Sequence, residues 1–134
     1  MRRLAAGAVL LVLLAPSSGT AAQTARLTIM HVVQNCHIWK NGAKSLGPAA
    51  RLTVARGTRI VLRSDCPMDF DIAQVKGLKV ALGDPRLHAG QSKTLVFRKA
   101  GTYRFTAANV QTPEERGLVV LGQANTLSLV VVVR

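Results

Sequence analysis

The sequence predicts an all-β fold, a Greek-key β-sandwich made of two sheets. Three observations predict it: short β-branched and aromatic runs recur along the chain, turn residues separate them, and helical periodicity is hard to find after residue 23. The chain has 134 residues. Once an amino-terminal leader is set aside, this length suits a single domain with one hydrophobic core, which we place at residues 23–134.

Each expected strand is a run of alternating or apolar residues that ends at a turn signal. In the run 58–63, Ile60 and Leu62 share one face while Arg59 and Arg63 share the other. The four valines 130–133 do not alternate, which indicates a strand covered on both faces or an edge strand covered by a loop. The expected strands are residues 26–33, 51–54, 58–63, 70–75, 78–82, 94–98, 102–107, 117–121 and 126–133.

The amino terminus has the organisation of a secretory signal peptide. Two arginines follow Met1, residues 4–15 are apolar, and residues 16–22 are small or polar. The apolar run is too short for a comfortable membrane span, although an uncleaved anchor is the alternative. We therefore expect residues 1–22 to be removed. The remaining chain is then periplasmic or secreted and has no transmembrane span.

The chain is strongly basic. Eighteen Lys and Arg residues face six Asp and Glu residues, a formal charge of +12, and removal of Arg2 and Arg3 with the leader leaves +10. The cations are scattered and few aromatic residues lie among them, which argues against nucleic acid as a partner. One interpretation is a solvated surface, and another is docking to an acidic redox partner or to an anionic envelope surface.

No enzymatic motif is evident in the sequence. It contains no phosphate-binding loop, nucleophile elbow or zinc signature. The three acidic residues at positions 65, 69 and 71 are close in sequence, but carboxylates near Lys and Arg in loops usually solvate the surface. We therefore expect a protein that is not an enzyme.

Two short clusters hold the residues with the most distinctive chemistry. Cys36, His37 and Trp39 lie in the first, and Cys66 and Met68 in the second. In an oxidising compartment Cys36 and Cys66 can form a disulfide. Alternatively, Cys36, His37, Cys66 and Met68 are soft ligands that suit Cu(I). Free or oligomer-linking thiols are a third interpretation. We expect Trp39 to lie in the core or to form a wall of the site.

Several segments resemble the cupredoxins, the fold family of plastocyanin and azurin. Residues 53–62 resemble that family's strand-turn-strand, residues 63–70 the loop that delivers its first copper histidine, and residues 99–105 the hairpin that leads to its copper cysteine. An immunoglobulin-type domain fits less well, because Trp39 follows Cys36 by only three residues. The resemblance implies a cupredoxin-like sandwich with a copper-related role.

The usual copper ligands of that family are largely missing here. Met68 or Asp69 stands at the first histidine position, Ala107 at the cysteine position and Leu118 at the axial methionine position. A type 1 centre needs two imidazoles and a thiolate. The resemblance therefore implies an exported protein that binds or carries copper, or transfers electrons, through a non-standard Cys/His/Met site. The alternative is a metal-free structural or binding module stapled by a Cys36–Cys66 disulfide.

Overall fold

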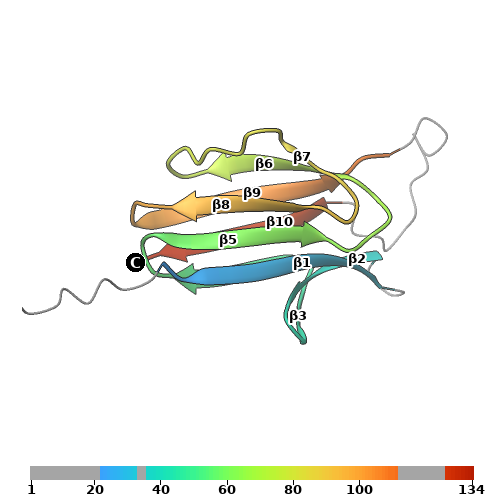
Figure 1. Ribbon diagram of the computed structural model, residues 1–134, viewed down its shortest axis with the longest axis horizontal. Helices are drawn as coiled ribbons and strands as arrows, with labels where there is room; N and C mark the ends of the chain where they lie inside the picture. Colours follow the sequence, from blue (N-terminus) through green and yellow to red (C-terminus); the bar gives the residue numbers. More distant parts are fainter. Residues whose placement is uncertain (1–21, 33–35, 112–125) are drawn as a thin grey trace, which may run out of the picture.

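A computed structural model describes residues 22–32, 36–111 and 126–134 and shows two five-stranded β-sheets packed face to face (Figure 1). The described residues form strands and connecting loops, with no helix among them. The strands are β1 (Thr24–Val32), β2 (Cys36–Asn41), β3 (Lys44–Gly47), β4 (Ala49–Val54), β5 (Thr58–Ser64), β6 (Phe70–Lys76), β7 (Arg86–Leu87), β8 (Ser92–Phe97), β9 (Gly101–Asn109) and β10 (Thr126–Val133).

The chain crosses repeatedly between the two sheets. One sheet has the order β3-β2-β1-β5-β8 and the other β4-β10-β9-β6-β7. β1 pairs with β5 and β4 with β10 in parallel, while the other pairs are antiparallel. This arrangement confirms the predicted all-β, two-sheet, cupredoxin-like sandwich. No helix among the described residues is long and apolar enough to cross a bilayer.

The core lies between the inner faces of the sheets, and the alternation seen in the sequence selects its residues. Ile60 and Leu62 on β5 are fully buried, whereas Arg59 is exposed. Phe97 of the first sheet packs edge-on against Tyr103 and Phe105 of the second, with ring centroids 5.0 and 5.9 Å apart. Such T-shaped contacts match the favoured geometry of aromatic pairs and lock the two sheets together.

Most of the strands expected from the sequence are present. β1, β4, β5, β6, β8, β9 and β10 overlap the expected runs with shifts of a few residues at their ends. β10 lies between β4 and β9, so the run of valines belongs to a central strand rather than to an edge. β2, β3 and β7 were not predicted. The expected strand at 117–121 and nearly all of the leader lie outside the described residues.

The expected strand at 78–82 is wrong, and a single side chain accounts for the difference. Gln74 donates through Nε2 to the Leu78 carbonyl at 2.7 Å, and its Oε1 accepts from the Val80 amide at 2.9 Å. The side-chain amide thus takes the hydrogen bonds that a neighbouring strand would have made. Gly77, with a φ of +101°, turns the chain at the start of this segment.

Strand direction gives the sandwich two distinct ends. β1, β5 and β9 finish at one end, where β2, β6 and β10 begin, on the right in Figure 1. We call it the site end, because it holds the loop 65–69 and the segment 88–91. The turns 55–57, 77–79 and 98–100 lie at the opposite end, together with the carboxyl terminus.

Candidate functional site

The loop that connects β5 to β6 is anchored by backbone hydrogen bonds on two sides. The Asp65 amide donates to the Ile29 carbonyl of β1 at 2.9 Å. Ser64, at the end of β5, donates its amide to the Gln91 carbonyl and accepts from the Gly90 amide, at 3.1 and 2.8 Å. Because both flanking segments belong to the sandwich, the side chains of residues 66–69 are held against its end.

His37 is completely buried at the site end, between the two sheets. It pairs in register with His31 of β1, and the two rings meet edge-on with centroids 5.4 Å apart. On its other side Phe70, the first residue of β6, meets the imidazole edge-on at 5.1 Å. The His37 ring is therefore enclosed between the rings of His31 and Phe70.

Cys66 lies in the hydrophobic core, with only 3% of its surface exposed. Its Sγ lies 3.5 Å from the Ile29 carbonyl oxygen, within reach of a weak S–H hydrogen bond. Cys36 begins β2 opposite Val32. The Cys36 side chain lies outside what the structure describes, so both the Cys36–Cys66 disulfide and the role of Cys36 as a ligand stay predictions.

Met68 is half-buried in the same loop and its thioether already has a polar neighbour. Asn109 Nδ2, at the end of β9, donates to Met68 Sδ at 3.4 Å. The Met68 carbonyl accepts from Ser64 Oγ at 3.3 Å. Asn109 also pairs in register with Phe70. Met68 is thereby placed over the strands that carry the aromatic neighbour of His37.

Asp69 closes the loop against the segment 88–91. One carboxylate oxygen accepts from the Ala89 amide at 2.9 Å, and the other lies 3.0 Å from His88 Nδ1. The Ala89 hydrogen bond, followed by that of His88, lowers the pKa of Asp69 below its usual value. Both oxygens therefore have protein partners, which makes Asp69 a loop-holding residue. His88, an exposed residue, is its counterpart.

Trp39 connects the site end to the core. Its side chain is 1% exposed, and its indole Nε1 donates across the sandwich to the Ser128 carbonyl of β10 at 3.0 Å. Trp39 pairs with Ile29 of β1, two residues from the His37–His31 pair. The tryptophan is thus a core residue, and its place two residues along β2 from His37 is consistent with the predicted role as a wall of the site.

The described residues do not fit a type 1 copper centre. Ala107, at the family's cysteine position, is 1% exposed and pairs with Ile72 and Leu127 inside the second sheet. Leu118 lies outside the described residues. In the described part of the chain no three His, Cys, Asp or Glu side chains gather as metal ligands do. His37, Cys66 and Met68 instead offer one imidazole, one thiol and one thioether at the same end, a soft donor set that fits Cu(I).

Comparisons with known proteins concern the architecture. No family model matches the chain, and no curated protein matches it. Among solved structures, a purple cupredoxin from Nitrosopumilus maritimus is 17% identical, with 82% of this chain and 99% of that chain covered and a TM-score of 0.49. A reduced amicyanin mutant is 18% identical, with 84% and 82% covered and a TM-score of 0.45.

A third similar structure is not a cupredoxin. The cysteine protease inhibitor EhICP2 from Entamoeba histolytica is 16% identical, with 87% of this chain and 100% of that chain covered and a TM-score of 0.48. All three similarities are of the sandwich, and at these values they assign neither a ligand nor an activity.

Proposed function

We propose that this protein is an exported cupredoxin-like copper protein whose ligands are Cys36, His37, Cys66 and Met68 instead of the type 1 set. It binds or carries copper, or passes electrons through it. One observation carries the proposal: His37, Cys66 and Met68, which come from β2 and from the β5–β6 loop, lie at the same end of the sandwich and contact its strands there.

A continuous set of contacts links two of these donors. His37 packs on Phe70, Phe70 pairs with Asn109 in register, and Asn109 donates to the sulfur of Met68. Cys66 lies two residues before Met68 in the same anchored loop. Because Phe70 and Asn109 belong to paired strands, the His37 imidazole and the Met68 thioether are attached to one framework. Rigid placement of ligands is what a metal site needs for a defined geometry.

The donor types suit the proposed metal. Copper bound here supplies one-electron redox chemistry, and soft sulfur ligands favour its Cu(I) form. Burial of His37 and Cys66 keeps water from both groups. The Asn109 amide holds the Met68 thioether in place and would release it to a metal at the cost of one weak hydrogen bond.

Export to an oxidising compartment would determine whether Cys36 and Cys66 form a disulfide or are available to bind copper. The leader at residues 1–22 directs the chain to a compartment where disulfides form. A Cys36–Cys66 disulfide would occupy two of the proposed ligands, so we expect copper binding to require the reduced protein. Electrons donated by a thiol reductant would open the disulfide to two thiols, which lose their protons on binding Cu(I).

Copper titration of the exported protein, oxidised and reduced, tests this proposal alongside a thiol count. We expect stoichiometric Cu(I) binding by the reduced form only. Cys66→Ser and Met68→Leu should each weaken it by at least about tenfold. Met30→Leu is the matched control for the second variant, because Met30 is also half-buried but lies on β1. His37→Ala should act like Cys66→Ser.

Each alternative outcome has a clear meaning. No Cu(I) binding in either state, together with no reactive thiol, would overturn the copper proposal and support the metal-free module with a Cys36–Cys66 disulfide. Binding that survives all three ligand substitutions would place the metal elsewhere. An intense blue colour with Cu(II) would show a type 1 centre whose ligands differ from those named here. Circular dichroism of each variant separates loss of ligand from loss of fold.

A further inference from the structure

We infer that the end of the sandwich opposite the candidate copper site docks onto a bilayer surface rich in anionic phospholipid. Two exposed apolar side chains project there, Val75 and Leu78, with 63% and 54% of their surfaces exposed. They are the large hydrophobic residues most exposed in the described chain. These two residues and the exposed cations around them together form what we call the basic end. The cations are Arg56, Lys76, Lys79, Arg98 and Lys99.

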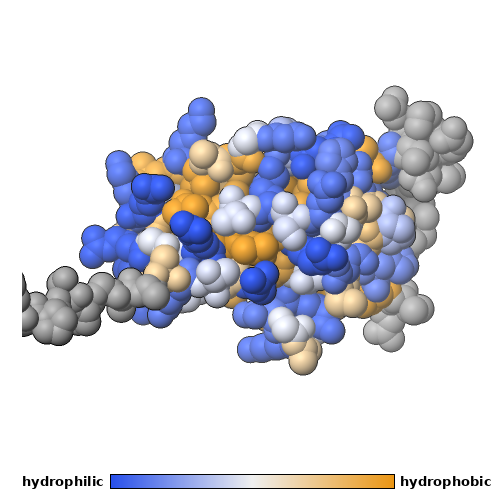
Figure 2. Space-filling model, viewed as in Figure 1, coloured by the Kyte–Doolittle hydropathy of each residue, from blue (hydrophilic) through white to orange (hydrophobic). Residues whose placement is uncertain are grey.

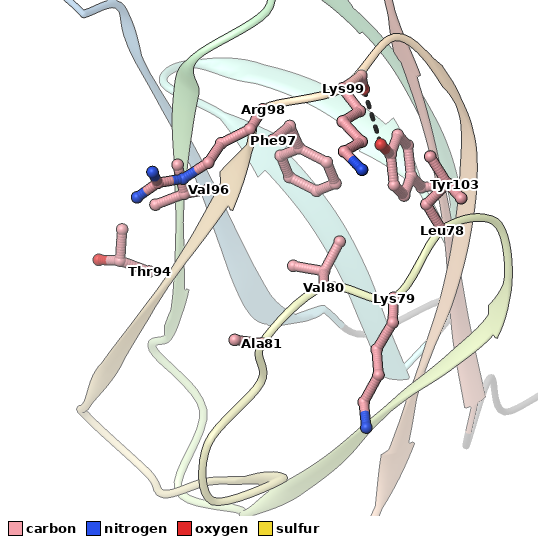
Figure 3. Close-up of a pocket in the computed structure, with 10 residues that line it drawn as sticks. All are labelled: Leu78, Lys79, Val80, Ala81, Thr94, Val96, Phe97, Arg98, Lys99 and Tyr103. Atoms are coloured by element: carbon pink, nitrogen blue, oxygen red, sulfur yellow. Dashed lines mark hydrogen bonds between the residues drawn. The ribbon is translucent and has the colours of Figure 1, made fainter.

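The basic end contains a groove. It has a volume of about 550 Å³ and lies between the segment 78–81 and the end of β8. Its floor includes Val80, Phe97 and Tyr103, whose hydroxyl donates to the Lys99 carbonyl at 2.6 Å. Figure 3 shows Lys79 and Lys99 extending from different segments around this apolar floor. Cations that border an apolar hollow match an amphiphile with an anionic head.

Charge is unevenly distributed between the two ends. The ion pairs of the described residues all include Arg63, Arg86 or His88, and their carboxylates Asp65, Asp69 and Asp71 flank the β5–β6 loop. None of the described ion pairs includes a cation of the basic end. In Figure 2 strongly hydrophilic residues lie beside hydrophobic ones on both the left and the right of the molecule. An anionic surface is therefore attracted more strongly to the basic end, whose cations take part in none of the described ion pairs, than to the end where cations and carboxylates pair with each other.

The composition of the basic end favours lipid over an acidic protein. Lysine is depleted in protein–protein interfaces, where aromatic residues and arginine dominate, yet three of the five cations here are lysines. The exposed apolar residues are aliphatic and few, without an exposed aromatic anchor. Lysines near an anionic bilayer add roughly independently, about fivefold in partitioning for each. Two aliphatic side chains among them can enter the interface between headgroups and acyl chains.

Vesicle co-sedimentation of the metal-free protein tests this inference and does not depend on copper. The probes are vesicles of phosphatidylcholine alone and of equal parts phosphatidylcholine and phosphatidylglycerol. We expect binding to the anionic vesicles only, weakening as salt rises. The double variant Lys79→Glu/Lys99→Glu should lower the partition constant by at least about 30-fold, and Leu78→Ser should lower it less. The charge-matched control is Lys44→Glu/Arg51→Glu, which alters exposed cations of β3 and β4.

Three results would overturn the inference. The unmodified protein could ignore anionic vesicles at moderate salt. The control variant could lose as much binding as Lys79→Glu/Lys99→Glu, which would show attraction by net charge alone. Binding to soluble polyglutamate without binding to vesicles would point to an acidic protein partner instead. Unchanged thermal unfolding of each variant establishes that the charge reversals act on the surface and leave the fold intact.

Discussion

The two ends of this sandwich are built from the same strands but differ in what their loops carry. At the site end, the β5–β6 loop brings a buried cysteine, a thioether and the carboxylates of Asp65 and Asp69, which contact Arg63 and His88. At the basic end, the turns and the end of β6 carry exposed cations and two exposed aliphatic side chains. The strands supply the framework, and the connections decide which chemistry each end presents.

The two ends should differ most in how much a single apolar side chain contributes to the free energy of unfolding. Phe70 is fully buried and contacts His37, whereas Leu78 is half exposed. Phe70→Ala should cost about 3–5 kcal/mol of stability, because it leaves a cavity between the sheets. Leu78→Ala should change stability by about 0.5 kcal/mol or less, since little apolar surface is lost from the core. Urea unfolding measures both, and equal costs would contradict the contrast.

The second prediction concerns the backbone of the basic end. At Gly77 a Cβ atom would lie 2.6 Å from the Thr102 carbonyl oxygen, and φ is +101°. Gly57 also has a positive φ, +82°, but a Cβ there would meet nothing within 4 Å. Gly57→Ala should therefore cost only the backbone strain, about 1–2 kcal/mol.

Gly77→Ala should cost about 3 kcal/mol or more, because the clash with a backbone oxygen adds to the strain. Thermal unfolding of the two variants gives the difference directly. Since the turn at Gly77 carries Leu78 and Lys79, the same variant should also weaken vesicle binding. If both variants lost the same amount of stability, the backbone around Gly77 would be able to move away from the Thr102 carbonyl oxygen without added cost.

The smallest expected effect is the pH dependence of the loop closure at the site end. The pKa of Asp69 is lowered from its ordinary value of 3.8 by the Ala89 amide and by His88. A depressed carboxyl pKa contributes stability that is fully present above 3.8 and is lost as the pH falls through the lower, folded-state value. Unfolding measured between neutral pH and the acid range should show this loss, and Asp69→Asn should reduce it. If the stability of the two proteins fell equally as the pH was lowered, Asp69 would not be the source of this pH dependence.

Local patterns were sufficient to predict most of the strands and the inner face of each. Alternation around Ile60 and Leu62 identified buried positions correctly, because strand side chains alternate with a period of two. The pattern failed at 78–82, where apolar residues suggested a strand. There the Gln74 side chain forms hydrogen bonds with the backbone of Leu78 and Val80. No local sequence pattern predicts hydrogen bonds of this kind.

The candidate site was predictable in its residue types and less so in its arrangement. Cys66 and Met68 stand out in the sequence, and the resemblance to cupredoxins places them in a ligand loop. β2 was not predicted, because Ile38 is the one β-branched residue among its six and the strand pattern is weak there. The contacts of His37 with Phe70 and of Asn109 with Met68 join residues far apart in the chain, so they depend on register and sheet packing.

The sequence by itself determined the all-β class, the faces of most strands, the excess of positive charge and the presence of soft copper-type donors. These properties depend only on composition and on residues close together in the sequence, so they can be predicted without knowing the tertiary structure. Only the tertiary structure decided that His37, Cys66 and Met68 lie at the same end of the described sandwich, while exposed cations and exposed aliphatic residues lie at the other. The direction and register of the described strands set these positions, because each pairing is fixed by packing across the whole sandwich.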